Sequence, residues 1–461
     1  MKKKLLAILT ATLLVVTLIP MFAFPAFADS DPWKGKGTET EPYLIGTLAE
    51  LEALAENVNG GIDYDGKYFK LTADIDGLTT PIGYKDNWDD IKKPFSGVFD
   101  GAGHIVSLKI DTSDNEHYSA GMFGYISNAT IKNVNVTGEV IGADNAGGIC
   151  GFNNKSNISN CSNSARISGG PGVGGIAGNN SSGGSGYKIV NCYNTGEVSG
   201  SGNCVGGIAG CSDLLNLNNC YNTGNVSGLY YVGGISGYCS NRLIIANCYS
   251  VGTVTGEGYV NAIVGILYVD RGISPKCDNC YYDSTIYIAV DTTTGVTGLT
   301  TTQMQAESGE DKALIDSLNG YKPQDTDYEY PEFFAKWTKK AGAHYPVFDV
   351  PYDVIIADSE NGKVTSDAST YKAGTEVTLK VAADNGYKLA SLKAIDADGD
   401  EVVIKDNKFT MPPVDVVVTA TFEKDVPKTG DENNMILWIV LAFVAAGLAV
   451  GTVLKAKKAN E

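Results

Sequence analysis

Short apolar and glycine-rich phrases recur at a nearly fixed interval between residues 119 and 282. Typical copies read VGGIAG and VGGISG, with small residues, two branched aliphatic residues and a closing glycine. The intervals between closing glycines are 27, 27, 32, 27 and 28 residues, and the long one contains an insertion at 181–186. Six copies at one period predict a stacked repeat fold, in which no unit buries its apolar face alone. The closing glycines are Gly124, Gly151, Gly178, Gly210, Gly237 and Gly265.

A second phrase follows each glycine phrase and places an asparagine, and in five copies a cysteine, at equivalent positions. The repeats lack a 3.6-residue period and are rich in β-branched residues, which disfavours helices. We therefore expect an all-β, right-handed parallel β-helix over 119–285, with equivalent residues about 4.8 Å apart in successive coils. Glycines at the turns would permit positive φ and close backbone approach. The expected columns are Cys161, Cys192, Cys220, Cys248 and Cys280, and Asn133, Asn160, Asn191, Asn219, Asn247 and Asn279.

These repeats resemble the GLUG-motif repeats of bacterial surface proteins. The residues that carry the resemblance are the GGI-x-G phrases and the N-C-Y-N-T-G-x-V segments at 191–198 and 219–226. The resemblance covers roughly a third of the chain. It implies a parallel β-helix on an exported protein and is weak for function, because many different exported proteins contain such repeats.

An amphipathic helix is predicted before the repeats. Thr47 and Glu50 have the spacing of a capping box, and apolar residues follow at helical spacing up to Gly60 and Gly61. Those apolar residues are Leu48, Leu51, Leu54, Ala55 and Val58. A solenoid must cover its first coil, because unpaired strand edges and apolar surface otherwise face water. We expect residues 29–118 to form this cap and irregular first coils.

The composition changes twice after the repeats. Residues 286–350 contain a predicted helix around 311–318 and an aromatic segment, which we interpret as a C-terminal cap on the last coil. Residues 351–424 alternate apolar and polar positions between turn signals, which predicts a small antiparallel β domain. This segment resembles the divergent InlB B-repeat or bacterial surface-repeat domain. The resemblance depends on Asn361-Gly362, Gly386-Tyr387 and the FTMP sequence at 409–412.

The N-terminus has the features of an export signal. Residues 1–28 combine a basic start, a long apolar run and the small residues Ala26 and Ala28 before Asp29. This order predicts a secretory signal peptide that is cleaved after Ala28. An uncleaved membrane anchor is the alternative.

The C-terminal segment 425–461 resembles a sortase sorting signal of the LPxTG type, with valine in place of leucine. The motif consists of Val426, Pro427, Lys428, Thr429 and Gly430. A polar spacer, twenty largely apolar residues and three lysines follow, which predicts a C-terminal transmembrane helix. The resemblance implies that a sortase cuts after the threonine and links it to cell-wall peptidoglycan of a Gram-positive bacterium. A tail-anchored membrane protein with a chance motif is the alternative.

The charge of the chain excludes some partners. The sequence has 35 basic and 53 acidic side chains, which gives a formal net charge of −18. Removing residues 1–28 and everything after Thr429 makes the remainder more negative, because these two segments contain six basic and three acidic residues. So acidic a surface repels nucleic acid and anionic lipid. We expect no nucleic-acid partner, and membrane contact only through the C-terminal helix before sorting.

All ten cysteines lie between residues 150 and 280. We expect the five column cysteines to be buried free thiols, because a solenoid supplies its own core and needs no disulfide framework. Cys211 and Cys239 follow equivalent glycines one coil apart and could form a disulfide. Cys277 and Cys280 have C-x-x-C spacing, but no second pair accompanies them. We therefore expect no metal site and no cofactor.

Two function classes remain, an enzyme and a binding module. Parallel β-helices also support polysaccharide lyases and glycosidases, which need facing carboxylates or a base with a charge-neutralising partner. The acidic residues of the repeats are scattered across the repeat phase, and no nucleophile or phosphate motif is present. We expect a non-enzymatic adhesin or binding module. The alternative is a carbohydrate-active enzyme with its site near Asp74, Asp76, Asp100 and His104.

A tyrosine follows each column cysteine from residue 192 onward. These residues are Tyr193, Tyr221, Tyr249 and Tyr281, with Tyr230, Tyr231, Tyr238 and Tyr259 nearby. Ring faces one coil apart suit a sugar chain or an extended peptide, so the column is the predicted site for a glycan or host-matrix protein. A stack of rings with a purely structural role is the alternative.

Overall fold

The computed structural model describes residues 32–425, apart from gaps at 86–91, 115–117, 182–186, 214–215, 242, 270–274, 288–290, 292, 323–333, 340–343, 350–351, 358, 369, 372–374, 397–400 and 413–415. The predicted signal peptide with Ala26, Ala28 and Asp29 lies outside these ranges. The sorting signal at 426–430 and the apolar segment after it also lie outside them. In the part of the chain that is described, no helix is long and apolar enough to cross a membrane.

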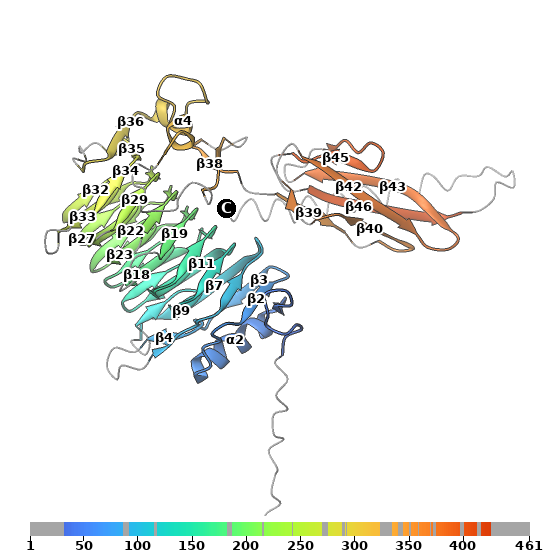
Figure 1. Cartoon of the computed structure of the whole chain (residues 1–461), viewed down its shortest axis with the longest axis horizontal. Coiled ribbons are helices and arrows are strands. Elements are labelled where there is room, and N and C mark those ends of the chain that lie inside the picture. Colours follow the sequence, from blue (N-terminus) through green and yellow to red (C-terminus); the bar gives the residue numbers. More distant parts are fainter. Residues whose placement is uncertain are drawn as a thin grey trace, which may run out of the picture.

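Residues 43–299 form a parallel β-solenoid whose coils stack along one axis (Figure 1). Each complete coil passes through four parallel sheets, which we number in the order in which the chain meets them. Sheet 1 contains β1 (Tyr43–Ile45), β2 (Tyr68–Leu71), β6 (Val98–Asp100), β10 (Thr130–Lys132), β14 (Asn157–Ser159), β19 (Lys188–Val190), β24 (Asn216–Asn218), β29 (Ile244–Ala246) and β34 (Lys276–Asp278). The predicted parallel fold is therefore confirmed, and the first coils share this sheet with the repeats.

Sheet 2 contains the most strands, because four coils contribute two short strands to it. It contains β3 (Ile75–Leu78), β7 (Ile105–Thr112), β11 (Asn135–Gly142), β15 (Ser162–Asn163), β16 (Arg166–Gly169), β20 (Tyr193–Asn194), β21 (Val198–Gly200), β25 (Tyr221–Asn222), β26 (Val226–Ser227), β30 (Tyr249–Ser250), β31 (Val254–Thr255), β35 (Cys280–Asp283) and β36 (Val296–Leu299).

Sheets 3 and 4 lie on either side of the glycine phrases. Sheet 3 contains β8 (Ser119–Ala120), β12 (Asn145–Gly147), β17 (Val173–Gly174), β22 (Asn203–Gly206), β27 (Tyr230–Gly233) and β32 (Gly258–Asn261). Sheet 4 contains β9 (Phe123–Ser127), β13 (Cys150–Asn154), β18 (Ala177–Ser181), β23 (Ala209–Asp213), β28 (Ser236–Ser240) and β33 (Val264–Tyr268). A short antiparallel pair, β4 (Tyr84–Lys85) and β5 (Lys92–Lys93), projects from the early coils.

The predicted asparagine column is confirmed and forms the corner between sheets 1 and 2. All six asparagines have φ between 51° and 56°, a left-handed conformation that asparagine tolerates better than most residues. From Asn160 onward, each side-chain amide donates to the side-chain carbonyl oxygen of the asparagine one coil before it, and Asn133 donates to Asp100. The Nδ2–Oδ1 distances shorten from 3.2 Å at the Asn160–Asn133 pair to 2.7 Å at the Asn279–Asn247 pair. The corner is thus held by a continuous chain of side-chain hydrogen bonds.

The repeated glycines are required for close packing of coils, and the prediction of positive φ at these glycines was wrong. The paired glycines of the repeats, such as Gly206 and Gly207, are not in the left-handed region. A Cβ atom on Gly207 would lie 2.1 Å from the carbonyl oxygen of Gly234, one coil further on. Only a hydrogen atom fits at that position.

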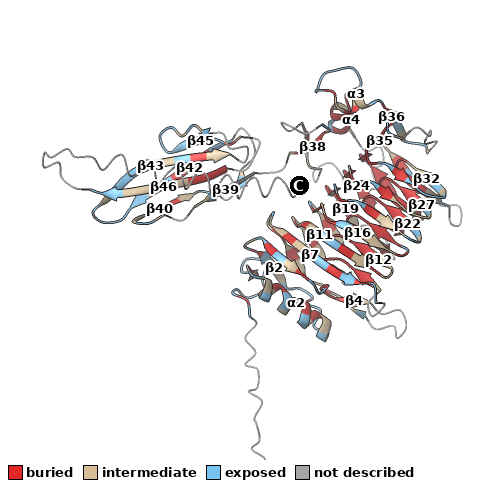
Figure 2. Ribbon diagram, turned by 180° about the vertical axis from the view of Figure 1, so that it is seen from behind, coloured by how far each residue is buried: buried red, intermediate tan, exposed pale blue. Residues whose placement is uncertain are grey.

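The five column cysteines line up inside the solenoid, as predicted, and all are free and fully buried. Each Sγ donates to the carbonyl oxygen two residues before it, as Cys220 does to Asn218 at 3.2 Å. The disulfide that Cys211 and Cys239 could have formed is absent, and both cysteines are free. Cys239 is in register with Ser212 and is buried, whereas Cys211 is in register with Tyr238 and points outward. Figure 2 shows how buried residues continue along the strands from coil to coil.

The predicted N-terminal helix is present as α2 (Leu48–Gly60), and the capping box between Thr47 and Glu50 is formed. The helix ends at Gly61, which has a φ of 111°. Leu51, Leu54, Ala55 and Val58 are buried and belong to the same apolar core as the coils. The helix covers the end of the solenoid at which the first strands lie (Figure 1).

The C-terminal cap differs from the prediction in its position. It contains α3 (Thr301–Met304), which was not predicted, α4 (Leu314–Asn319), β37 (Trp337–Thr338) and β38 (Val347–Phe348). Strand β36 extends sheet 2 beyond the last repeat. The described part of the cap also packs along the flank of the solenoid, from Tyr193 to Tyr281, and forms a second apolar core there.

The remaining residues form a separate β module with its own apolar core. Its strands are β39 (Tyr352–Ile356), β40 (Gly362–Ser366), β41 (Thr370–Tyr371), β42 (Glu376–Ala383), β43 (Tyr387–Asp396), β44 (Glu401–Val402), β45 (Lys408–Thr410) and β46 (Val416–Lys424). The pairing is antiparallel, as predicted, except that β39 and β46 are parallel. The predicted turns at Asn361 and Gly386 have left-handed φ values of 64° and 84°.

Candidate ligand-binding surface

The tyrosine column that the sequence suggested as a binding site is covered by the chain itself. Tyr221 is 4% exposed and Tyr249 is 0% exposed. The Trp337 ring lies 5.7 Å and 5.6 Å from these two rings, measured between centroids. Tyr193 and Tyr281 are half-buried members of the same core. In this arrangement the two central rings contact the C-terminal cap in place of a ligand.

The column is nevertheless as regular as its spacing predicted. The rings of Tyr193 and Tyr221 are stacked with centroids 4.8 Å apart and planes 1° from parallel, and those of Tyr221 and Tyr249 are 5.1 Å apart. The hydroxyl of Tyr249 donates to the carbonyl oxygen of Pro346 in the cap. The stack therefore has a clear structural role, which is to hold the cap.

A different group of tyrosines is exposed, on the outer face of sheets 3 and 4. We call Tyr230, Tyr231, Tyr238, Tyr259 and Tyr268 the tyrosine surface. Tyr230 and Tyr231 come from β27, Tyr238 from β28, Tyr259 from β32 and Tyr268 from β33. Tyr230 is 41% exposed, Tyr259 is 61% exposed and Tyr268 is 49% exposed. The surface thus spans two adjacent coils near the C-terminal end of the repeats.

Strand register brings these rings together. Tyr231 precedes the buried Val232 and Tyr259 precedes the partly buried Val260, and those valines are paired. The two tyrosines are therefore in one outward column, and their ring centroids lie 5.3 Å apart. Across the glycine corner the rings of Tyr231 and Tyr238 meet edge to face at 5.9 Å.

The other two rings extend the surface at its edges. The Tyr238 and Tyr268 rings are stacked at 5.8 Å. The ring of Tyr230 lies over Gly258, since a Cβ atom on that glycine would come within 2.6 Å of it. A bulkier residue at 258 would displace the ring. The absence of a side chain at Gly258 therefore leaves room for the Tyr230 ring.

The tyrosine surface combines ring faces with phenolic hydroxyls. Within the described residues, no hydrogen bond to protein is recorded for the hydroxyls of Tyr230, Tyr259 and Tyr268. Partial burial and the neighbouring Tyr268 raise the pKa of Tyr238. Such a surface presents apolar ring faces for stacking and neutral donors at their rim.

The sequence analysis noted four of these tyrosines but gave priority to the column that the C-terminal cap covers. It missed Tyr268, which follows the degenerate sixth repeat. Strand register could have identified it, because Tyr268 is paired with Ser240, the equivalent residue of the preceding coil. What the sequence did not reveal is which column the C-terminal cap would cover.

Among the acidic residues considered for catalysis, Asp74 is the one in contact with His104. Asp74 is exposed and lies 3.1 Å from Nδ1 of His104, and its carboxylate also accepts from the amide of Ile105. Asp76 is exposed on the neighbouring strand. The structure thus brings the histidine to one aspartate.

Asp100 is occupied by structural contacts. Burial alone would raise its pKa, but hydrogen bonds from Asn133 and the amide of Ala102 and the charge of Lys132 together lower it. A carboxylate that stays ionised and bonded in this way is suited to holding a turn and not to donating a proton.

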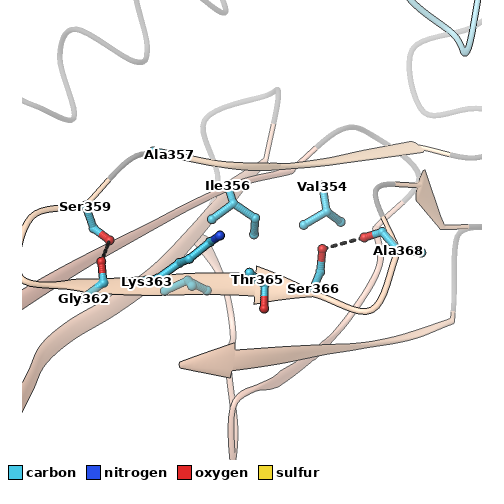
Figure 3. Close-up of a pocket in the computed structure, with 10 residues that line it drawn as sticks. Val354, Ile356, Ala357, Ser359, Gly362, Lys363, Thr365, Ser366 and Ala368 are labelled. Carbon is cyan, nitrogen blue, oxygen red and sulfur yellow. Dashed lines mark hydrogen bonds between the residues drawn. The ribbon is translucent and has the colours of Figure 1, made fainter. Parts of the chain in front are cut away.

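A shallow hollow in the C-terminal β module offers little chemistry (Figure 3). Its lining includes apolar residues such as Val354 and Ile356 and the aliphatic stem of Lys363. Two serine hydroxyls in the lining are already used, because Ser359 donates to Gly362 and Ser366 donates to Ala368. Among the described residues, the lining brings no carboxylate or histidine to accompany Lys363.

Comparison with known proteins identifies the C-terminal module. Residues 352–426 match the Divergent InlB B-repeat domain. This confirms the resemblance that the turn and FTMP signals predicted for residues 351–424. The match covers the β module alone, and the solenoid lies outside it.

Two relatives match about a quarter of the chain each. The chain is 31% identical to halomucin of Haloquadratum walsbyi over 122 residues. This match covers 23% of this chain and 1% of halomucin. It is 33% identical over 127 residues to a protein of Evansella cellulosilytica that is named as a Gly-rich membrane protein. That match covers 26% of this chain and 14% of the Evansella protein. The chain thus spans only a small part of the length of either relative. No solved structure matches it.

Proposed function

We propose that this chain is a cell-wall-anchored surface protein of a Gram-positive bacterium whose solenoid is a non-enzymatic adhesin or binding module. Three observations support the surface location. The C-terminal module matches a repeat domain typical of surface proteins. One relative is named as a membrane protein. The sequence has the features expected of an N-terminal export signal, repeats that resemble GLUG motifs, and VPKTG followed by an apolar segment.

The tyrosine surface is the observation that carries the binding role. Monomeric proteins seldom expose clustered aromatic rings without a use for them. The five rings bring no formal charge to the surface, and their faces suit the C–H faces of sugars while the hydroxyls suit sugar hydroxyls. We therefore assign a neutral glycan as the ligand class, and the tyrosine surface replaces the covered column Tyr193, Tyr221, Tyr249 and Tyr281 as its site.

A binding experiment tests this assignment. The purified full chain is screened against plant, host and microbial glycans and against matrix proteins, and any hit is repeated with Tyr231→Ala and Tyr259→Ala. Tyr387→Ala, a partly exposed ring in the C-terminal module, is the matched control. We expect both solenoid variants to lose glycan binding while the control keeps it. Unchanged binding by a folded Tyr259→Ala variant would remove the surface as the site, and binding confined to matrix proteins would change the ligand class.

The same screen addresses the enzymatic alternative. Incubation of the full chain with each polysaccharide should leave the polymer length unchanged if the solenoid only binds. Release of sugars that Asp74→Asn and His104→Ala variants fail to produce would favour a carbohydrate-active enzyme in the early coils. The scattered carboxylates described above support the binding module instead.

Anchoring is tested separately, in cells. Sortase would cut after Thr429 and join its carboxyl to peptidoglycan, so the wild-type protein should appear in the fraction released by muramidase. Thr429→Ala should move the protein to the membrane fraction. An unchanged amount of the variant in the wall fraction would contradict the sorting proposal and would leave the binding proposal intact.

A further inference from the structure

Cys204 and Cys211 are set apart from the other cysteines by their position. They lie in the same coil, in β22 and β23, on either side of the glycine corner. Their neighbours Val205 and Ser212 are fully buried, so the alternation of a strand points both cysteines outward. The other eight cysteines are buried, whereas these two are partly exposed.

The two side chains are also in contact with each other. The two thiols are close enough for each to shift the pKa of the other. The equivalent residues one coil further on are Tyr231 and Tyr238, whose rings meet at 5.9 Å. Cys204 and Tyr231 share a left-handed backbone, with φ values of 67° and 57°. Two coils with different side chains thus show the same convergence across the corner.

The contact makes the two sulfurs chemically unequal. The neighbouring Cys211 thiol lowers the pKa of the Cys204 thiol below its usual value. The Cys204 thiol, with burial, raises the pKa of the Cys211 thiol. A partly exposed thiol with a lowered pKa and a second thiol in contact with it is the arrangement found at sites of thiol–disulfide exchange.

We propose that Cys204 and Cys211 form an intramolecular disulfide under oxidising conditions. The oxidant is a low-molecular-weight disulfide. The Cys204 thiolate attacks one of its sulfurs, which forms a mixed disulfide and releases one thiolate. Cys211 then loses its proton and attacks the Cys204 sulfur, which releases the second thiolate. The two cysteines are oxidised, one small disulfide is reduced, and both protons end on the two small thiols that leave.

The bond would lock the corner directly beneath the tyrosine surface. Cys204 precedes Tyr231 in one outward column, and Cys211 precedes Tyr238 in the other. A covalent link there fixes the separation of the two columns one coil below the Tyr231–Tyr238 pair. The formation of the disulfide depends on the local geometry alone. Its occurrence outside the cell rests on the proposed surface location.

The test uses the purified full chain in glutathione buffers of increasing oxidised fraction, followed by acid quenching, alkylation and peptide mass spectrometry. We expect one cross-linked peptide pair, joining residues 204 and 211, in the oxidised buffers. In fully reducing buffer, alkylation of the native protein should label these two cysteines and spare the column cysteines until urea is added. Separate labels on Cys204 and Cys211 in the most oxidising buffer, or a bond to another cysteine, would overturn the proposal.

Single variants sharpen the result. Cys211→Ser should abolish the cross-link and leave Cys204 as a mixed disulfide with glutathione, since no second thiol can resolve it. Cys239→Ala removes a buried thiol in the next coil and should leave the cross-link unchanged. Because this experiment is done on purified protein, a failed wall-fraction test would not alter its outcome, and its own failure would not affect anchoring or glycan binding.

Discussion

Nε1 of Trp337 in the C-terminal cap donates a hydrogen bond of 2.8 Å to Oδ1 of Asn219 in the asparagine column. The amide of Ala335 donates to Asn191 at 3.0 Å, and the Asn219 side chain donates back to the carbonyl of Ala335 at 3.1 Å. The same asparagines that hold the corner of each coil therefore also hold the cap. The cap in turn seals the stacked tyrosines beside that corner.

Truncation of Trp337 should release the cap. Trp337→Ala removes a buried ring that packs on Tyr221 and Tyr249, and the loss of such a ring costs about 3–5 kcal/mol. Urea unfolding followed by circular dichroism and limited proteolysis should show lower stability and cleavage first in residues 300–349. Trp337→Phe keeps most of the packing and should cost about 1 kcal/mol for the lost hydrogen bond. Equal effects of the two variants would contradict a packing role.

Substitution in the asparagine column should depend on backbone conformation as well as on hydrogen bonding. Asn219 is fully buried with a φ of 51°, and its side chain bonds to Asn191, Asn247, Ala335 and Trp337. Asn219→Ala should destabilise by about 3 kcal/mol or more, because buried partners lose their bonds. Asn219→Gly should be milder by about 1 kcal/mol, since glycine adopts this conformation freely.

Asn128 provides the matched control for that experiment. It has a φ of 55° but is exposed. Asn128→Ala should therefore lower the free energy of unfolding only by the cost of placing alanine in a left-handed conformation, about 1 kcal/mol. Equal losses at 128 and 219 in chemical unfolding would show that the column adds nothing.

Glycine-to-alanine substitutions should show which glycines are required because neighbouring coils pack too closely for a Cβ atom. A Cβ atom on Gly207 would lie 2.1 Å from the carbonyl oxygen of Gly234 and 2.4 Å from the side chain of Asn222. Gly207→Ala must push two coils apart, and we expect a loss of about 3 kcal/mol or failure to fold. Gly60 has open space around its Cβ position, so Gly60→Ala at the end of α2 should be neutral or slightly stabilising. Melting temperatures of the two variants provide the comparison.

Alkaline pH should destabilise the protein through its buried tyrosines. Burial raises the pKa of Tyr249 well above the usual phenol value, and burial with neighbouring tyrosines does the same for Tyr221. The unfolded chain ionises both above pH about 10 while the folded chain keeps them neutral. The stability they contribute is therefore complete below that pH and is lost as pH rises toward the folded values.

The size of this effect is measurable by urea unfolding at several pH values. Each buried tyrosine adds up to about 1.4 kcal/mol of lost stability per pH unit above its unfolded pKa. Tyr249→Phe should flatten the alkaline slope, although it loses the bond to Pro346. Tyr230→Phe, at an exposed ring, should leave the slope as it is. An unchanged slope in Tyr249→Phe would show that this tyrosine ionises normally in the folded chain.

The solenoid could be predicted from the sequence because the same contacts between neighbouring coils recur at the period of the sequence repeat. A contact between residue n and the equivalent residue one coil on recurs at every period, so columns such as the cysteines and asparagines follow from spacing alone. The capping box of α2 and the turns of the C-terminal module depend on a few adjacent residues, and they were found for the same reason. The positive φ at asparagine in place of glycine was missed, because both residue types favour that conformation and only coordinates distinguish them.

The tertiary structure alone decided which tyrosines face solvent. Trp337 and Asn219 are separated by 118 residues, and no period relates the cap to the coil on which it packs. The sequence therefore determined that outward rings recur one coil apart, but not that the column from Tyr193 to Tyr281 would be sealed and the tyrosine surface left open. The contact of Cys204 with Cys211 has the same origin. It depends on how the glycine corner turns one column toward another, which is a property of the folded coil.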